Sequence, residues 1–541
     1  MPNNSEALQR LLQADTRAES GNLPLADWPL VPGLTIVHHP DPGRVGERVA
    51  LAGLAAGREE SVSRQEPAFS PPGQSLLRPL ADPYLSRRPF RLAPGAEPGG
   101  ARLLCAGSGT AVVADGAAVS GELEIPPARL ERGVVLLLAG RVVLLLSRID
   151  PVGLAGAPGF GLAGESAPVH ALRREIQRVA GLDVPVLLRG ETGTGKELVA
   201  RALHDAGPRH GRPWIALNMA AVPPSLAAAE LFGAARGAYT GADRKRDGAF
   251  QRADGGTLFL DEVGETPPEV QALLLRALET REVQPVGSDE VRRVDARLIA
   301  ATDADLAGAV ADGRFRAPLL HRLAGYEIRL PSLRERRDDF GRLFLHFLRQ
   351  ELEELGEAGR LETPPEGRSW VPAPLVARLA ACDWPGNVRQ LRNAVRQLVI
   401  AGRDAGEPGM WLQAERLFQE GARAAARQDS DPTGVPPAKA AGEPPRASYR
   451  SPEDVSEDEL IAALRANRWR IQRAAAQLGI SRGSLYDKIE RSSRIRKAAD
   501  LSREEIEACR ASHGEDLDAM VEALEVSKRG LQRRMTQLGL L

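Results

Sequence analysis

A lysine that follows three closely spaced glycines is the first feature of this sequence with an evident chemistry. Gly190, Gly193 and Gly195 lie in the run G-E-T-G-T-G-K-E, which ends at Lys196 and Glu197. Glycines allow backbone N–H groups to turn inward around phosphates, and a lysine at this position reaches the β and γ phosphates. The run therefore predicts a nucleotide site. Its predicted binding residues are Gly190, Glu191, Thr192, Gly193, Thr194, Gly195, Lys196 and Glu197.

Two adjacent carboxylates supply a second piece of chemistry. Asp261 and Glu262 end the apolar run T-L-F-L-D-E. Carboxylates at the end of a buried strand are costly unless they serve a cation, so we expect Asp261 to hold Mg²⁺ and Glu262 to polarise an attacking water. Glu197 stands where such loops usually carry a Ser or Thr hydroxyl on Mg²⁺, so the phosphates, water and Asp261 must hold the metal. The expected cofactors are ATP and Mg²⁺.

The flanking elements place these residues at one edge of a sheet. The apolar positions between Val184 and Leu188 predict a buried strand, and a helical pattern starts near Lys196. Strands and helices then alternate, as they do in α/β folds with a parallel sheet. The alternative, a glycine-rich turn with an incidental lysine, does not account for the agreement between spacing and flanking elements.

Length and composition limit the class of protein. A chain of 541 residues predicts several domains, and a formal net charge of -1 excludes a polyanion-binding protein overall without excluding local basic patches. Three scattered cysteines form neither a disulfide framework nor a zinc spacing, which fits a reducing cytoplasm. The most apolar run, Val134 to Leu146, is interrupted by Ala139-Gly140-Arg141 and predicts two strands joined by a turn, not a membrane span.

The central region, from about Gly164 to Leu398, resembles the AAA+ domain of sigma-54-dependent transcriptional activators. That family also has G-E-x-G-T-G-K-E, and its G-A-F-T-G-A loop is matched here by G-A-Y-T-G-A. The resemblance implies that this loop contacts sigma-54, with tyrosine in place of phenylalanine. The implied contact residues are Gly237, Ala238, Tyr239, Thr240, Gly241 and Ala242.

Further family positions carry over one at a time. Asn218 matches the asparagine that couples the catalytic glutamate to nucleotide state, and Asp303 lies where the sensor I asparagine usually stands. Arg316 and Arg322 match the arginines offered in trans to the neighbouring subunit's nucleotide, and Arg389 matches the sensor II arginine of the helical lid. The resemblance therefore implies a homo-oligomeric ring, a hexamer assembled from dimers, in which all five side chains act in catalysis or nucleotide sensing.

The N-terminal region predicts an all-β sandwich that weakly resembles a forkhead-associated domain. Gly57-Arg58, Ser86-Arg87-Arg88 and Ser108-Gly109-Thr110 match that family's motifs, although Pro89 and Gly109 replace its histidine and asparagine. The resemblance implies a phosphothreonine protein or a kinase as partner, held by Arg58, Ser86 and Arg87. The alternative is a sandwich that only mediates protein contacts. The predicted strands are Leu34–Val37, Leu85–Leu92, Ala101–Cys105, Ala111–Val113, Val134–Leu138 and Val142–Leu146.

The C-terminal region contains an internal repeat. Residues 455–489 and 501–535 superpose at an offset of 46, and each copy opens with the capping box S-x-x-E. In the first copy a helix over Ile471–Leu478, a turn at Gly479 and a following helix resemble a Fis-type helix-turn-helix, and residues 465–497 carry ten Lys or Arg and two acids, which favours DNA. The second copy is either a second DNA reader or a packing partner. The candidate DNA-binding residues are Arg482, Gly483, Ser484, Tyr486, Lys488, Lys528 and Arg529.

Together these features predict a multi-domain, ATP-hydrolysing transcriptional activator that binds upstream DNA and remodels sigma-54 RNA polymerase holoenzyme. The alternative is a nucleotide-binding DNA regulator or repressor that does not remodel. The predicted order is a leader (1–32), a forkhead-associated-like all-β sandwich (33–150), a linker (151–163), an AAA+ α/β ATPase subdomain (164–330), its helical lid (331–402), a linker (403–450), an all-α Fis-type helix-turn-helix (451–495) and a second repeat of it (496–541).

Overall fold

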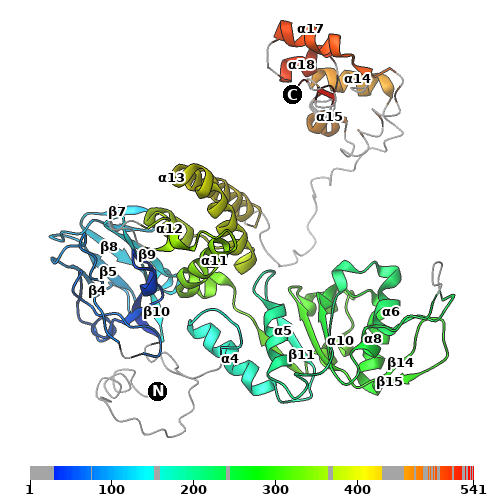
Figure 1. Ribbon diagram of the computed structural model, residues 1–541, viewed down its shortest axis with the longest axis horizontal. Coiled ribbons are helices and arrows are strands. Elements are labelled where there is room, and N and C mark those ends of the chain that lie inside the picture. Colours follow the sequence, from blue (N-terminus) through cyan, green and yellow to red (C-terminus); the bar gives the residue numbers. More distant parts are fainter. Residues whose placement is uncertain are drawn as a thin grey trace, which may run out of the picture. The chain divides into compact units, whose positions relative to one another are not determined.

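The structure is a computed structural model in which the chain forms two compact units, residues 1–432 and 433–541. Figure 1 labels the elements of each unit. The described residues are 30–74, 76–150, 159–238, 244–362, 369–428, 456–467, 469, 471–478, 485, 488, 492, 494–495, 500–513, 517–524, 526, 531, 534–535, 538 and 540. Among them no helix is long and apolar enough to cross a membrane.

The N-terminal region, called the β-domain below, contains two antiparallel sheets. One has the strand order β2-β1-β10-β9-β6-β7 and the other β3-β4-β5-β8. The strands are β1 (Val31–His38), β2 (Arg48–Ala50), β3 (Glu60–Val62), β4 (Phe90–Pro94), β5 (Ala101–Leu104), β6 (Val112–Ala114), β7 (Ala117–Val119), β8 (Glu122–Ile125), β9 (Val134–Leu138) and β10 (Val142–Ile149), with the short helices α2 (Ala52–Ala55) and α3 (Pro127–Arg132).

Strands β9 and β10 confirm the prediction for the most apolar run. Three residues, Ala139 to Arg141, join them, and Ala139 and Gly140 have positive φ, as a tight turn between two strands requires. Side chains from both sheets, including Leu92, Leu136 and Leu144, form one buried core. The predicted strand Leu85–Leu92 is wrong in its first half, because the strand starts only at Phe90, after Pro89.

The central region is built on a parallel five-stranded sheet of order β12-β13-β16-β11-β17. Successive residues of β11 serve opposite faces: Leu187 belongs to one core cluster, and Val186 and Leu188 belong to the other. This near-continuous apolar pattern is typical of a parallel strand covered on both sides. The strands are β11 (Val186–Arg189), β12 (Trp214–Asn218), β13 (Thr257–Asp261), β16 (Arg297–Thr302) and β17 (Tyr326–Arg329), and a separate pair is β14 (Glu282–Val283) with β15 (Arg292–Arg293). The helices are α4 (Ala167–Val179), α5 (Lys196–Asp205), α6 (Pro224–Phe232), α7 (Ala249–Arg252), α8 (Pro268–Thr280), α9 (Leu306–Ala311) and α10 (Ala317–Leu323).

A helical lid follows this sheet in the chain. It opens with the short helices η4 (Leu333–Glu335) and η5 (Arg337–Asp339) and continues with α11 (Phe340–Glu354), η6 (Ala358–Leu361), α12 (Ala373–Ala380) and α13 (Asn387–Gln428). Gly406, with φ +63°, and Pro408 divide α13 into two helical parts. The helix therefore continues beyond residue 402, where the sequence predicts a linker to begin.

The C-terminal unit is all-α in its described residues. Its helices are α14 (Glu457–Ala466), α15 (Ile471–Leu478), α17 (Arg503–His513) and α18 (Leu517–Leu524). Both predicted capping boxes are confirmed, because Ser456 pairs with Glu459 and Ser502 pairs with Glu505 through reciprocal hydrogen bonds. Side chains of both copies, among them Leu464 and Ile506, share one core. The two repeats therefore pack as one folded unit.

Candidate nucleotide site

The predicted phosphate loop joins β11 to α5. Gly193 (φ +81°) and Gly195 (φ +103°) adopt left-handed conformations that favour glycine, and Gly195 is the N-cap of α5. Lys196 opens the helix with only 7% of its surface exposed, and its Nζ donates to the carbonyl of Gly190 (2.9 Å). A buried ammonium beside inward-turned glycines fits a phosphate group, which would take over the hydrogen bond that the loop carbonyl now accepts.

The carboxyl ends of β12 and β13 bring the predicted acids to the same edge. Glu262 Oε1 lies 3.5 Å from Lys196 Nζ, and Glu262 has a left-handed backbone (φ +51°). Burial raises the pKa of Glu262, Lys196 lowers it, and the nearby Asp303 and Asp261 raise it further. A carboxylate with a raised pKa at a strand end suits the general-base role that the sequence predicts.

Asn218, the last residue of β12, contacts Asp261. Its Nδ2 donates to Asp261 Oδ2 (3.0 Å), while its Oδ1 accepts from the N–H groups of Ala220 and Ala221. The coupling to the catalytic glutamate that the resemblance implies stays a prediction, and the described side-chain contact of Asn218 is with Asp261, the predicted Mg²⁺ ligand. Cross-strand register explains this arrangement, because Asn218 pairs directly with Asp261 in the parallel β12–β13 ladder.

Asp303 follows β16 and faces the phosphate loop. The hydroxyl of Thr192 donates to its carboxylate, and this hydrogen bond lowers the pKa of Asp303. Asp303, in place of the sensor I asparagine, therefore adds a carboxylate near Glu262 and engages the hydroxyl of Thr192.

The lid is hydrogen-bonded to the phosphate loop through Arg334 and through Asn387 and Val388, the two residues before the predicted sensor II arginine. Arg334 donates to the carboxylate of Glu191 (Nη1–Oε2 2.8 Å), and these bonds lower the pKa of Glu191. Asn387, fully buried, donates from Nδ2 to Glu191 Oε2 and to the carbonyl of Thr192 (both 3.1 Å). The N–H of Val388 adds a bond to the carbonyl of Gly193 (3.0 Å). Asn387 and Val388 stand beside Arg389 in the predicted sensor II segment, whereas no local motif signals Arg334, whose partner Glu191 lies 143 residues away.

The three predicted sensor and finger arginines are exposed. Arg389 lies against the phosphate loop, with its backbone N–H bonded to the Gly193 carbonyl (3.3 Å). Arg316 is the N-cap of α10, and Arg322 donates to the carbonyl of Leu278 (3.0 and 3.2 Å). Neither of these two side chains has a described contact with the phosphate loop of its own chain.

Comparison with known proteins decides the family. Residues 162–329 match the sigma-54 interaction domain, residues 334–432 match the AAA+ ATPase lid domain, and residues 451–491 match the Fis family of bacterial regulatory proteins. The transcriptional regulatory protein ZraR of Salmonella typhimurium is 41% identical over 341 residues, which are 62% of this chain and 70% of ZraR. The chain belongs to the sigma-54-dependent transcriptional regulators.

A second relative and a solved structure are also similar to this chain. The anaerobic nitric oxide reductase transcription regulator NorR of Klebsiella pneumoniae is 39% identical over 363 residues, which are 65% of this regulator and 67% of NorR. Among solved structures, NtrX from Brucella abortus in complex with ATP has 30% identity and a TM-score of 0.41 and covers 61% of this chain and 68% of its own. The lid match extends to residue 432, in agreement with the length of α13.

Only the base of the regulator's predicted sigma-54 loop is described. Ala234 and Arg246 exchange backbone hydrogen bonds (2.9 and 3.0 Å), and Ala235 N–H bonds to the carbonyl of Val286. Gly237 and Ala238 continue from this base, and Gly237 has φ +80°. Tyr239, Thr240, Gly241 and Ala242 lie outside the described residues.

The predicted phosphothreonine residues are brought together in part. Ser86 N–H bonds to Thr110 Oγ1 (3.0 Å), so two of the three matched motifs lie side by side. Ser86 Oγ accepts from the N–H of Arg88 (3.0 Å), and Arg58 and Arg87 are exposed. Arg58 has no described contact with the other two motifs.

The predicted DNA-reading residues fall almost wholly outside the description. Arg482, Gly483, Ser484, Tyr486, Lys528 and Arg529 lie outside the described residues. Lys488 is described and is half-buried within a helical stretch. The scaffold helix α15 has the bounds that the sequence predicts.

Proposed function

We propose that this regulator is an ATP-hydrolysing activator that works on sigma-54 RNA polymerase holoenzyme. The observation that carries the proposal is the placement of Lys196 Nζ 3.5 Å from Glu262, beneath a loop that the lid contacts directly. A cation for the phosphates and a carboxylate for the water thus share one edge of the sheet, as phosphoryl transfer to water requires.

The residues present fit ATP and Mg²⁺. Asp261 would hold the metal, which would neutralise charge on the phosphates, and Asn218 would orient Asp261 through its amide. Glu262 would accept the proton of the attacking water. Arg316 and Arg322 lack a described cis contact with the loop, which favours their use in trans within a hexameric ring.

The sigma-54 contact is proposed for residues 237–242. Their hairpin base is held by Ala234, Arg246 and Val286, so the loop is attached to the ATPase core at a defined place. Nucleotide-dependent movement of that base would carry Tyr239 toward or away from sigma-54.

DNA binding is proposed for the C-terminal unit, through Arg482, Gly483, Ser484, Tyr486 and Lys488 and, in the second copy, Lys528 and Arg529. The shared core of both repeats supports a role of the second copy in packing. Footprinting of the full chain and of a chain lacking Leu501–Leu541 tests this point. An equally long protected region supports packing, whereas loss of a half-site shows that the second copy reads DNA.

The β-domain is proposed to be a forkhead-associated-like sandwich that gates the ATPase. The contact of Ser86 with Thr110 supports two of its motifs, while the described positions leave Arg58 apart. A phosphothreonine peptide titrated onto the full chain, with Arg87→Ala as the comparison, tests whether the domain binds a phosphorylated partner.

A nucleotide-binding regulator that does not remodel is the second candidate. The hydrogen bond between Thr192 and Asp303 favours this second candidate. It engages a hydroxyl of the phosphate loop and places a carboxylate near the phosphates. The deciding experiment measures ATPase activity of the full chain against protein concentration, with and without sigma-54. A specific activity that rises with concentration supports a ring with shared sites. Nucleotide binding without turnover at any concentration supports the second candidate.

A further inference from the structure

The six-stranded sheet of the β-domain is apolar on both of its faces. In β9 and β10, Leu136 and Leu144 point into the core of the β-domain. Their neighbours Val135, Leu137, Val143 and Leu145 belong instead to the core of the lid, together with residues of α11, α12 and α13. Alternate residues of a strand lie on opposite faces, so each strand contributes to two cores. The outer face of this sheet is therefore a packed interface with the lid.

Two glycines mark the closest approach of the β-domain to the lid. A Cβ atom at Gly341 in α11 would lie 2.4 Å from the backbone oxygen of Val37, at the end of β1. Arg342, the next residue, donates from Nη2 to the carbonyl of Gly46 (3.0 Å). The first turn of α11 thus rests on the backbone of the β-domain, where only glycine fits.

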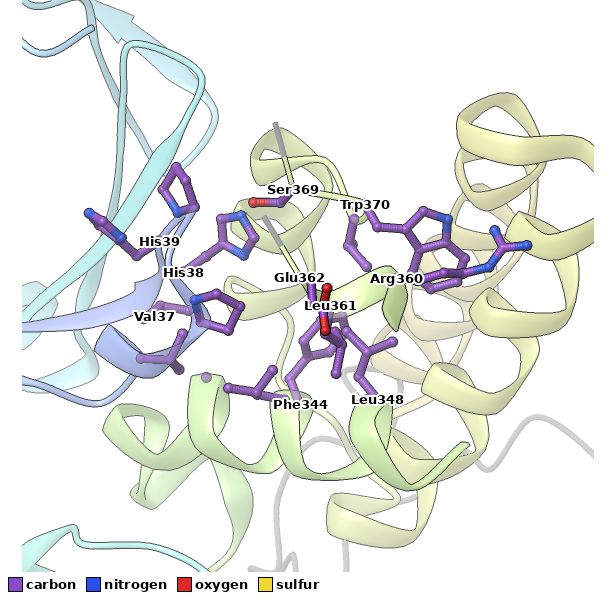
Figure 2. A pocket seen from close by; sticks show the side chains of 16 residues that line it. Val37, His38, His39, Phe344, Leu348, Arg360, Leu361, Glu362, Ser369 and Trp370 are labelled. Atoms are coloured by element: carbon purple, nitrogen blue, oxygen red, sulfur yellow. The ribbon is translucent and has the colours of Figure 1, made fainter. Parts of the chain in front are cut away.

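The packing leaves one cavity of about 40 Å³ at the edge of this interface. Figure 2 shows it between the end of β1, with Val37 and His38, and the lid side chains of Phe344, Leu348 and Trp370. By the volume that one water occupies, roughly 10–15 Å³, the cavity has room for a few waters only. Val37, Phe344 and Leu348 in its wall belong to the core that the sheet shares with the lid.

A charged contact joins the same interface to the lid loop at Asp383. Arg132, the last residue of α3, donates from Nη2 to both carboxylate oxygens of Asp383 (2.9 Å each). Arg337 of the lid donates to the same carboxylate, and burial lowers the pKa of Arg337, whose side chain is 9% exposed. Asp383 therefore neutralises the buried guanidinium of Arg337 and is also bound by Arg132 of the β-domain.

The loop that begins at Asp383 continues directly to the phosphate loop. Trp384 is buried in the lid core, Asn387 bonds to the carbonyl of Thr192, and Val388 bonds to that of Gly193. Three residues, Trp384 to Gly386, thus separate Asp383 from Asn387, the first residue of this loop that bonds to the phosphate loop. The connection is short, and both Trp384 and Asn387 are buried.

We infer that the β-domain is a positioning element of the nucleotide site. Arg132 acts through Asp383 on residues 384–388, and these hold the phosphate loop in the conformation that binds nucleotide. The inference rests on the nucleotide binding proposed above. The outer face of the sheet is covered by the lid. A partner would therefore alter nucleotide affinity by binding to the loops of the β-domain that carry Ser86 and Arg87.

The test compares two perturbed variants of the full chain with two matched controls. Arg132→Glu repels Asp383, whereas Arg129→Ala, on the same helix, removes a contact within the β-domain, to Asp115. Gly341→Ala inserts a methyl group against Val37, whereas Gly359→Ala adds one where no atom lies within 4 Å. The measurements are affinity for a fluorescent ADP analogue and amide hydrogen exchange of residues 190–195 and 384–388.

We expect Arg132→Glu to weaken ADP binding by about two- to fivefold, as loss of an exposed ion pair of up to about 1 kcal/mol implies. Gly341→Ala should weaken it more, and both should speed exchange in the two segments. Arg132→Lys should restore most of the affinity, and the controls should match the unaltered chain.

Unchanged affinity and exchange in both perturbed variants, with faster exchange in β9 and β10 proving that the interface has opened, would overturn the inference. Tighter ADP binding would also overturn it, since the β-domain would then restrain the site. If the unaltered chain binds no ADP, the proposed function fails, and exchange of residues 384–388 in the Arg132→Glu chain still decides the positioning role.

Discussion

Asn387 offers the sharpest test of how the lid and the phosphate loop are joined. Its Oδ1 accepts from Leu333 N–H (2.8 Å), and its Nδ2 donates to Glu191 and to the carbonyl of Thr192 (both 3.1 Å). The side chain is fully buried and the backbone is left-handed, with φ +51°. One amide thus connects the start of the lid to the nucleotide loop.

Asn387→Ala would leave the buried N–H of Leu333 without its partner and would remove one donor from the carbonyl of Thr192, an exposed residue. A buried group left unsatisfied costs about 1–3 kcal/mol, and alanine in a left-handed conformation adds about 1 kcal/mol. We therefore expect local destabilisation of about 2–4 kcal/mol. Asn387→Gly loses the same hydrogen bonds without the backbone cost, so it should be milder than the alanine variant by about 1 kcal/mol.

Amide hydrogen exchange of Leu333 measures this effect directly, because its N–H is the donor to Asn387. At 1.4 kcal/mol per tenfold, protection of Leu333 should fall by roughly 30- to 700-fold in Asn387→Ala. Gln390→Ala is the control, since Gln390 accepts only from Gly386 within the same loop. Equal protection in the alanine and glycine variants would refute the backbone part of the argument. Unchanged protection of Leu333 would refute the hydrogen-bond part.

Four further outcomes are expected. Glu262→Gln should retain ATP binding and lose turnover, measured by ligand titration and phosphate release, because the carboxylate acts on water; equal loss of both would contradict this role. Asp303→Asn should raise the ATPase rate several-fold by removing a negative charge beside the phosphates, and a lower rate would show that the carboxylate assists. Tyr239→Ala should keep ATPase activity and lose the sigma-54 contact in a nucleotide-trapped complex, while Tyr239→Phe keeps it. His170, whose Nε2 lies 3.0 Å from Glu165 Oε2, lowers the pKa of Glu165 to about 2, so the stabilisation from ionised Glu165 is present above about pH 4.5 and is lost as pH falls toward 2. Acid unfolding of Glu165→Gln should therefore lack this component, and an unchanged acid profile would contradict it.

The sequence predicts those parts of the site that are local in the chain. The glycines and Lys196 lie within seven residues, and β13 ends in Asp261 as the apolar run T-L-F-L-D indicates. The carboxyl ends of parallel strands meet at one edge, so Asn218 and Asp303 reach the same site without any further signal. The partner that each of them contacts depends on strand register, which the sequence does not give. The register of β12 and β13 pairs Asn218 with Asp261.

The contacts between domains were beyond local reasoning for a physical reason. Arg334 is one of many arginines in this chain, and only the packing of the lid gives it, and Asn387 of the sensor II segment, Glu191 as a partner. The predicted linker after residue 402 shows the opposite error. Glycine and proline at 406 and 408 indicate a break, and the structure has one, but α13 resumes and places Met410 and Ala414 in the lid core. Tertiary packing outweighs the local signal there.

Strands β9 and β10, buried on both faces, also determine which fragments of the protein are suitable for ATPase measurements. Continuous apolar sequence is typical of strands buried on both faces, and an antiparallel sheet at the surface would instead alternate apolar and polar residues. Removal of residues 30–150 would expose lid side chains such as Phe344 and Val376 that now pack in the core shared with the β-domain. An ATPase fragment that starts at Gly164 would then carry an apolar patch prone to association, and its activity would vary with concentration for a reason unrelated to ring assembly. Concentration dependence therefore reports on the ring only when it is measured on a chain that retains the β-domain.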